Sequence, residues 1–150
     1  MSNLRFSKLK PHPILFDEEQ TGAFASELRT LAAQEQVPPW CTYIGWLEDS
    51  PVVMGGYKGA PGEENSVEIG YLTFEEHQGK GHATALAAFL IQLAEEHGVR
   101  AVTAHTSMEV NASTRVLEKT GFVRNGIGYD EDVGAVWRWH RVSSAATPRN

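Results

Sequence analysis

A glycine-rich turn at residues 78–83, Gln-Gly-Lys-Gly-His-Ala, carries the clearest chemical signal in this sequence. It lies between a strand-like segment at 67–72 and a strongly helical segment, so it opens a helix whose first N–H groups have no backbone partner. These amides and the helix dipole favour an anion such as a phosphate. Gly79 and Gly81 allow close approach of the backbone, and Lys80 adds a positive charge. The turn therefore predicts a phosphate-binding site.

Two common phosphate motifs do not fit this turn. A P-loop requires Ser or Thr directly after its Gly-Lys pair, whereas Gly81 and His82 follow Lys80. A Rossmann fingerprint requires three glycines in a fixed spacing, of which only part is present. The pattern that fits is Gln-x-x-Gly-x-Ala, at Gln78, Gly81 and Ala83. It resembles the corresponding motif of the GNAT superfamily of acetyl-CoA-dependent N-acetyltransferases.

A second block, at residues 105–122, strengthens this resemblance. Its part Asn111-Ala-Ser-Thr-Arg-Val-Leu-Glu-Lys-Thr-Gly-Phe122 resembles the C-terminal half of the GNAT core, in the branch that includes the ribosomal-protein alanine N-acetyltransferases. The two blocks stand in the family's order, separated by one helix and one strand. The resemblance covers roughly residues 43–141. It implies a mixed α/β GNAT fold, with a twisted, mostly antiparallel sheet that is flanked by helices and splayed at the acetyl-CoA site.

The resemblance also implies a set of contacts to acetyl-CoA as co-substrate, without a metal. Backbone N–H groups near Tyr71 and Leu72 are expected to meet the oxyanion, where preorganised amides contribute roughly 10²–10³-fold in rate. Thr73 is expected to follow the pantetheine arm, and Asn111 to reach it. The full set of implied cofactor-binding residues is Tyr71, Leu72, Thr73, Gln78, Gly79, Lys80, Gly81, His82, Ala83 and Asn111.

Glu68 is the candidate general base. A base is needed at neutral pH because an alkyl ammonium has a pKa near ~10 and an α-amine near ~8. Glu68 stands between Val67 and Ile69 on the strand that leads to the turn, where burial would raise its pKa. In the superfamily a glutamate on this strand commonly acts as base, often through water. The alternative is an edge carboxylate that faces solvent or pairs with a Lys or Arg.

Ser113 is the candidate proton donor to the leaving thiolate. The usual GNAT acid is a tyrosine in the short helix before Gly-Phe, but this chain has Leu117 and Glu118 in that region. The ribosomal branch implies the serine at the helix start, acting directly or through water. Water alone is an alternative, since a thiol has a pKa of about 8.5. Ser113 and Asn111 are also both suited to cap the helix, and for Ser113 the cap is the favoured interpretation.

Other reactive side chains predict no further site. The sequence has six histidines, but they form no tight ligand cluster, so no metal is expected, and His82 is expected to face the phosphates or solvent. Cys41 is expected to be a small core or surface thiol. Trp137 and Trp139 share one face of the last strand, which fits a core and a homodimer interface equally well.

Composition and length predict one globular domain, residues 1–150. The net charge of −6 argues against binding to nucleic acid or anionic membranes. One cysteine excludes an intrachain disulfide. No signal-peptide pattern and no apolar run long enough to span a bilayer is seen, so a cytoplasmic location is the default expectation. Residues 143–150 are small and polar and are expected to form a flexible tail.

Hydrophobic periodicity and turn residues predict the elements that position these groups. The unit at 66–106 should be a right-handed parallel strand–helix–strand crossover. The expected elements are a helix at Asp17–Gln34 capped by Asp17, strands at 43–47, 52–57 and 67–72, a helix from Gly81 to Gly98, a strand at 99–106, a short helix from Asn111 or Ser113 to Gly121, and a hairpin of 122–129 with 135–142.

The sequence thus predicts an N-acetyltransferase in which a primary amine attacks the thioester of acetyl-CoA directly. The acceptor stays open between a protein N-terminus and a small molecule such as an amino acid, a polyamine or an antibiotic amine. The alternative is a catalytically silent GNAT-like module that binds CoA as a sensor or scaffold. A nucleotide-binding α/β domain is disfavoured by the block at 111–122.

Overall fold

The computed structural model describes residues 3–34 and 36–143 of the chain. Its strands form a seven-stranded sheet in the order β1-β2-β3-β4-β5-β7-β6, in which only β4 and β5 run parallel. This mixed, mostly antiparallel sheet confirms the expected fold class. The strands are β1 (Leu4–Lys8), β2 (Thr42–Leu47), β3 (Ser50–Tyr57), β4 (Ser66–Thr73), β5 (Ala101–Thr106), β6 (Val123–Asp130) and β7 (Gly134–Val142).

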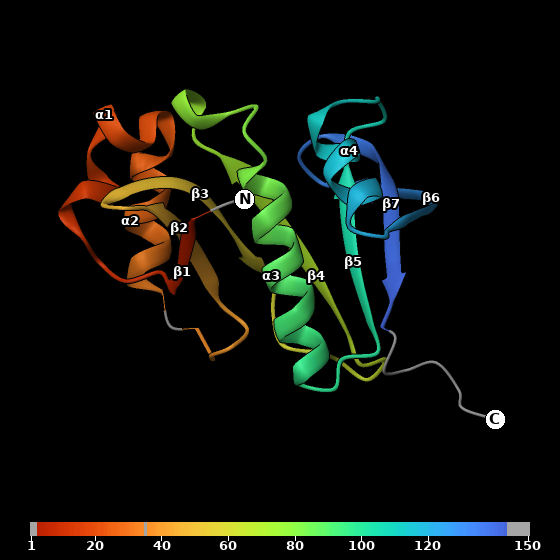
Figure 1. Ribbon diagram of the computed structural model, residues 1–150. Coiled ribbons are helices and arrows are strands. Elements are labelled where there is room, and N and C mark those ends of the chain that lie inside the picture. The colour runs from red at the N-terminus through yellow and green to blue at the C-terminus, as the bar shows by residue number, and fades with distance from the viewer. Residues whose placement is uncertain (1–2, 35, 144–150) are drawn as a thin grey trace.

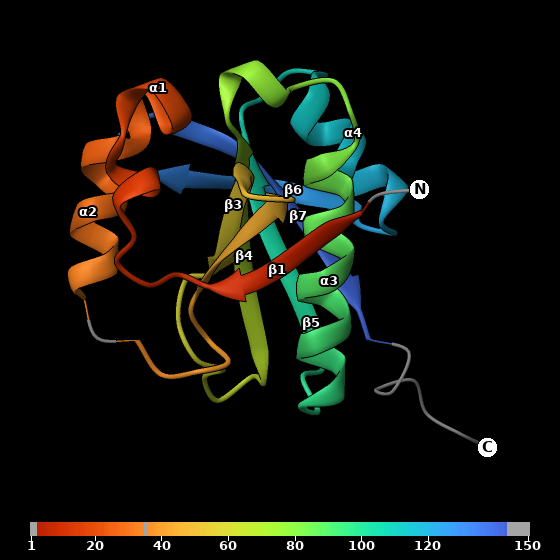
Figure 2. The same ribbon diagram turned by 60° about the vertical axis from the view of Figure 1, so that its left-hand side comes forward.

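Helices cover both faces of the sheet (Figures 1 and 2). In Figure 2, α3 (His82–Glu96) and α4 (Ala112–Lys119) lie on one side, and α1 (Glu18–Thr21) and α2 (Ala25–Ala33) lie on the other. Three 3-10 turns, η1 (Pro13–Phe16), η2 (Gly22–Phe24) and η3 (Glu75–His77), complete the described helices. The sheet therefore separates two surfaces, one under α3 and α4 and one under α1 and α2.

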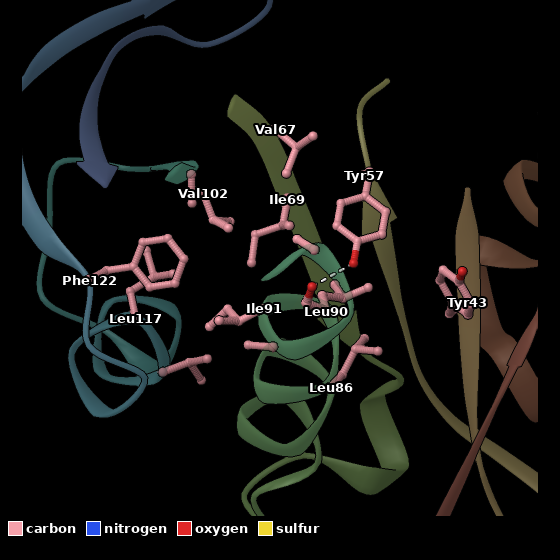
Figure 3. Close-up of a cluster of buried hydrophobic side chains, with 14 of the residues drawn as sticks. Tyr43, Tyr57, Val67, Ile69, Leu86, Leu90, Ile91, Val102, Leu117 and Phe122 are labelled. Atoms are coloured by element: carbon pink, nitrogen blue, oxygen red, sulfur yellow. Dashed lines mark hydrogen bonds between the residues drawn. The ribbon is translucent and has the colours of Figure 1, made fainter. Parts of the chain in front are cut away.

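The larger core lies between the sheet and α3. Leu86, Leu90 and Ala94 recur at helical spacing and are fully buried, and they pack against strand residues such as Val67 and Ile69 (Figure 3). The Tyr57 hydroxyl donates to the Leu90 carbonyl within this core. This packing fixes α3 on β3 and β4, and so fixes the position of its N-terminus.

The N-terminal helix differs from the expectation. Asp17 accepts a hydrogen bond from the Glu19 N–H at 2.9 Å and caps α1, as predicted. The predicted single helix at Asp17–Gln34 is wrong, because Gly22 has φ +60° and interrupts it, giving α1, η2 and α2 in succession. The apolar residues of α2 still face a second core, in which Leu28 is fully buried.

The parallel pair β4 and β5 separates partway along its length. Pairing runs from Ser66 opposite Ala101 to Glu68 opposite Thr103 and goes no further, although β4 continues to Thr73 and β5 to Thr106. The predicted crossover and splay are thus both present. Beyond Glu68 one edge of β4 faces a gap rather than a neighbouring strand.

The C-terminal elements agree with the expectation, except at the end of the chain. β6 and β7 form the predicted hairpin, with pairing from Val123 to Asp130. Ser143 is buried, and its N–H donates to the Arg100 carbonyl at 2.8 Å, so it does not belong to the tail predicted at 143–150. The rest of that predicted tail, residues 144–150, lies outside the described residues.

Candidate active site

The glycine turn opens α3 with free backbone donors. Gly79 and Gly81 have φ of +78° and +83°, a left-handed conformation that favours glycine. A Cβ at either position would meet no atom within 4 Å, so the turn is open to a ligand. Gly81 is the N-cap residue and supplies no side-chain hydrogen bond to the first turn of the helix. The amides there remain available to an anion.

A cavity of about 540 Å³ connects this turn to α4 and β4. Lys80 and Asn111 do not line it, in contrast to the other residues that the resemblance implied for the cofactor. The lining residues include Tyr71, Leu72, Thr73, Gln78, Gly79, Gly81, His82, Ala83 and Ser113. The structure therefore gathers one strand end and two helix starts, which lie apart in sequence, around a single hollow.

Of the Tyr71 and Leu72 backbone amides, one faces the gap between the parted strands. The Lys58 N–H donates to the Glu68 carbonyl at 2.9 Å, so every second residue from Glu68 onward directs its backbone groups toward β3. The Leu72 N–H consequently faces β3, and the Tyr71 N–H faces the gap. Of the two amides expected near an oxyanion, only that of Tyr71 is placed to meet one.

Asn111, and not Ser113, caps α4. The Asn111 side chain accepts from the Thr114 N–H at 3.1 Å, and the Thr114 hydroxyl accepts from the Asn111 N–H at 2.9 Å, which is a reciprocal capping box. The interpretation of Ser113 as the cap is therefore wrong. Asn111 is thus engaged in the cap and is not among the residues that line the cavity.

Ser113 instead contacts a tyrosine hydroxyl from β4. The Ser113 Oγ donates to the Tyr71 hydroxyl at 3.3 Å, and that hydroxyl donates to the Ser113 carbonyl at 2.9 Å. Burial raises the pKa of Tyr71 to about 12, so the phenol is protonated at neutral pH. The sequence reasoning considered only the backbone of Tyr71. Ile69 is buried under α3, and residues two apart on a strand share a face. Strand alternation therefore could have predicted that the Tyr71 side chain lies on the α3 and α4 face.

Glu68 lies on the opposite face, in a cluster with two basic groups. Lys58 Nζ and His105 Nδ1 each lie 2.9 Å from Glu68 Oε2. Partial burial by itself would raise the pKa of Glu68, but the hydrogen bonds and charges of Lys58 and His105 outweigh it and hold that pKa below its usual value. The expectation of a raised pKa is wrong, and the alternative of a carboxylate paired with a lysine is what the structure shows. Lys58 and His105 were missed by the sequence reasoning.

Two further cavities lie on this side of the sheet. One of about 550 Å³ is lined by Trp40, Lys58 and Gly70 and also by Tyr71 and Leu72, which line the cavity beside α3 as well. The other, of about 360 Å³, is lined by Lys58, Glu68, His105 and the tip of the β6–β7 hairpin. The three cavities thus meet around the parted strands. A larger cavity, of about 760 Å³ along β1 and η1, shares no residue with them.

The remaining reactive side chains are mostly part of the core. Cys41 is buried, and burial raises the pKa of its thiol. Trp139 is 4% exposed and its indole N–H donates to Thr106, which favours the core interpretation for this residue. His82 is 7% exposed, so of its two expected positions, facing the phosphates or facing solvent, the second is wrong. Neither ring nitrogen has a hydrogen-bond partner in the described part of the chain. Burial lowers the pKa of His82, which favours the neutral ring.

Neither a metal cluster nor a membrane span is found in residues 3–34 and 36–143. No group of three or more His, Cys, Asp and Glu side chains there is arranged to hold a metal ion. None of the helices in that part of the chain combines the length and apolarity that crossing a membrane requires.

Comparison with known proteins agrees with this architecture. The structure of a spermidine N-acetyltransferase SpeG K23-Q34 chimera from Vibrio cholerae and hSSAT matches with a TM-score of 0.79 and 17% identity, over 99% of this chain and 100% of that chain. The structure of AAC(6')-Ib in complex with ribostamycin and coenzyme A matches with a TM-score of 0.74 and 18% identity, over 96% of each chain. At these identities the likeness concerns the fold.

Sequence comparison adds a relative and a family. The chain is 33% identical over 89 residues to the uncharacterized N-acetyltransferase YjdG of Bacillus subtilis (strain 168). The match spans 55% of this chain and about half, 53%, of that relative. The model of the acetyltransferase (GNAT) family matches residues 9–122, which include the glycine turn, the parted strands and α4. The chain therefore belongs to the acetyltransferase (GNAT) family.

Proposed function

We propose that this protein transfers the acetyl group of acetyl-CoA to a primary amine by direct attack of the amine on the thioester. The observation that carries the proposal is the parting of β4 and β5 beside the open N-terminus of α3. The gap gives a thioester access to the face of the sheet that carries Glu68. An acceptor on that face and a cofactor on the α3 face then meet at Tyr71.

The cavity beside α3 fits the phosphates and pantetheine arm of acetyl-CoA. Gly79 and Gly81 leave space where any other side chain would stand, and the free amides of α3 suit a pyrophosphate. His82 lines the same cavity, with its ring nitrogens buried and without a hydrogen-bond partner in the described part of the chain. Lys80 lies outside the lining and contributes its charge at longer range.

The Tyr71 N–H and the Ser113 hydroxyl have complementary roles in this proposal. The amide stabilises the oxyanion that forms when the amine adds to the carbonyl carbon. When the C–S bond breaks, the electron pair stays on sulfur, and the Ser113 Oγ–H gives its proton to the thiolate. The Tyr71 hydroxyl, which accepts a hydrogen bond from the Ser113 Oγ at 3.3 Å, positions this serine beside the cavity, and solvent replaces its proton.

The acceptor amine enters from the face that carries Glu68. The cavities lined by Lys58 offer room for its carbon skeleton, one of them with apolar walls that include Trp40. The solved relatives named above comprise a spermidine acetyltransferase and a protein bound to the aminoglycoside ribostamycin, so small-molecule amines are the first acceptors to examine.

Two measurements test the proposal. Acetyl-CoA should raise the melting temperature of the protein, because it binds the folded state only. Release of free CoA should then be followed over a panel of polyamines, aminoglycosides, arylalkylamines, amino acids and peptides. Binding without CoA release beyond the rate of thioester hydrolysis, for every amine, would contradict transfer and leave a silent CoA-binding module.

A further inference from the structure

We propose that His105 accepts the proton of the acceptor amine, and that Glu68 is a positioning residue that orients the His105 ring. This inference rests on the proposed amine acetylation and assigns its proton transfer to a residue that the sequence did not indicate. It changes the role of Glu68 from base to partner of the base.

The strand register places His105 at the point where β4 and β5 separate. The last paired residues are Glu68 and Thr103, so continuing the register by two residues sets His105 across the gap from Gly70. Val102, Ala104 and Thr106 are buried on the α3 face, and strand alternation therefore puts His105 on the same face as Glu68. His105 is therefore level with Gly70, two residues nearer than Glu68 to Tyr71 along the strand direction.

The contact with Glu68 selects which ring nitrogen of His105 can take a proton. His105 Nδ1 lies 2.9 Å from Glu68 Oε2, and a carboxylate can only accept, so Nδ1 carries the hydrogen. Nε2 then holds the lone pair, and in the described part of the chain it makes no hydrogen bond. The His105 side chain is 34% exposed, and its Nε2 lies beside Gly128, where an added Cβ would come within 3.2 Å of it.

The charges argue against Glu68 itself as the acceptor of the proton. Its pKa lies below the usual value because Lys58 and His105 both stabilise the carboxylate, which makes it a weaker base than an isolated glutamate. An imidazole, in contrast, has an unperturbed pKa near neutral pH and suits general base catalysis there. In this arrangement the imidazole is the base and the carboxylate orients it, as in a catalytic triad.

Other ionisable groups surround the ring and shape its electrostatics. Lys58 follows β3, Arg138 is opposite His105 on β7, and an acidic hairpin tip closes the third side. Backbone N–H groups of Asp132 and Val133 hold the pKa of Asp130 below its usual value, so this acid stays ionised. The charged and titratable groups that face His105 are Lys58, Glu68, Tyr129, Asp130, Glu131, Asp132 and Arg138.

The proton and electron movements balance without another reactant. Nε2 takes a proton from the acceptor ammonium, and the nitrogen lone pair so freed forms the C–N bond to the acetyl carbon. The C–S bond breaks, sulfur keeps the electron pair, and Ser113 protonates the thiolate. The attacking nitrogen gives its second proton to solvent as it becomes an amide nitrogen, and Ser113 regains its proton from solvent. The imidazolium returns its proton to water, and Glu68 stabilises its positive charge until it does so.

The experiment compares base-deleted variants and their chemical rescue, with the best amine of the panel as acceptor. His105→Ala should lower turnover at pH 7 by roughly 10²–10⁴-fold and should recover part of it when imidazole is added. Glu68→Ala should also be slow, but imidazole should not restore it, because its own His105 still occupies the space. His12→Ala, which removes an exposed histidine on another cavity, should leave the rate unchanged.

Opposite results would overturn the assignment. Formate rescue of Glu68→Ala, together with near wild-type turnover in His105→Gln, would make the carboxylate the base while leaving amine acetylation intact. The acetyl-CoA thermal shift of each variant shows separately that the protein is folded and binds its co-substrate. Lack of CoA release by the wild type with every amine would instead contradict the proposed function, and this inference with it.

Discussion

The two faces of the sheet beside the parted strands differ in the groups they offer a ligand. On the α3 face the cofactor cavity depends on backbone groups, with two left-handed glycines, free helix amides and the Tyr71 N–H. On the opposite face the proposed acceptor side depends on side chains from several elements: Lys58 Nζ and His105 Nδ1 each lie 2.9 Å from one carboxylate oxygen of Glu68. The glycine turn of the first site is one short segment of the sequence. The side chains of the second site are far apart in the sequence and are brought together only by the pairing of the strands.

This difference determines how each side can be disrupted. A backbone site is closed by adding atoms or strain, because there is no side chain to remove. A side-chain site is disabled by removing a single functional group while the fold is kept. The following predictions use these contrasting changes, beginning with the largest expected effect.

Closing the backbone site should abolish acetyl-CoA binding. Gly81→Asp would put a side chain and a negative charge against the pyrophosphate. At about 100 times Kd, acetyl-CoA should raise the melting temperature of the wild type by roughly 5–10 °C, which corresponds to about 2.7 kcal/mol, and that of the variant hardly at all.

Gly98→Asp is the matched control for backbone strain. Gly98 has φ +79°, close to the +83° of Gly81, but stands past the other end of α3. Its variant should lose stability and keep the full acetyl-CoA shift. Equal shifts for Gly81→Asp and the wild type would remove the pyrophosphate from this turn.

Deleting hydroxyls near Tyr71 should slow the chemical step and spare cofactor binding. Ser113→Ala removes the proton donor and should lower the single-turnover rate by up to roughly 10²-fold. Tyr71→Phe removes one hydrogen-bond partner of Ser113, which is worth about 0.5–1.5 kcal/mol or up to about tenfold in rate.

Tyr43→Phe makes the same chemical change outside the site, since the Tyr43 hydroxyl donates to the Pro39 carbonyl at 2.8 Å. Its single-turnover rate should equal that of the wild type. If Ser113→Ala also shows wild-type kinetics from pH 6 to 9, the range around a thiol pKa of about 8.5, water is the proton donor.

The two helix-start residues should separate stability from rate. Asn111→Ala breaks the capping box and should lower the free energy of unfolding by roughly 0.5–2 kcal/mol, measured by urea denaturation. Ser113→Ala keeps the capping box and removes only the long hydrogen bond to Tyr71, so its loss of stability should be the smaller of the two. A larger loss in Ser113→Ala than in Asn111→Ala would reverse this assignment.

The ion cluster on the acceptor side should leave a small signature in acid. The folded-state pKa of Glu68 is lowered, so its stabilising contribution is present above the ordinary value of 4.5 and is lost as the pH falls through the folded-state value. The stability difference between wild type and Glu68→Gln should therefore shrink as the pH falls below about 4.5. Glu63→Gln, at an exposed loop position, provides the control. A difference that is constant from pH 7 to pH 3 would show that Glu68 is not stabilised as a carboxylate.

Much of the fold, and the open glycine turn of the proposed cofactor side, could be predicted because the information is local. Glycines at 79 and 81 next to a helical segment indicate an anion site, whatever surrounds them. The same local logic located the hairpin at 123–142, the crossover at 66–106 and the cap at Asp17. The prediction of one helix at Asp17–Gln34 failed because Gly22 interrupts the helix, although the apolar residues around it have helical spacing.

The tertiary structure alone decided which side chains meet on the proposed acceptor side and at the proposed proton donor. His105 is 37 residues from Glu68 in the chain, and Ser113 is 42 residues from Tyr71, so no periodicity could pair them. A pKa depends on which charges lie within a few ångströms, and for Glu68 these come from the end of β3 and from β5. The sequence by itself determined that a carboxylate stands on the strand leading to the glycine turn. The sheet register determined that this carboxylate meets a lysine and a histidine.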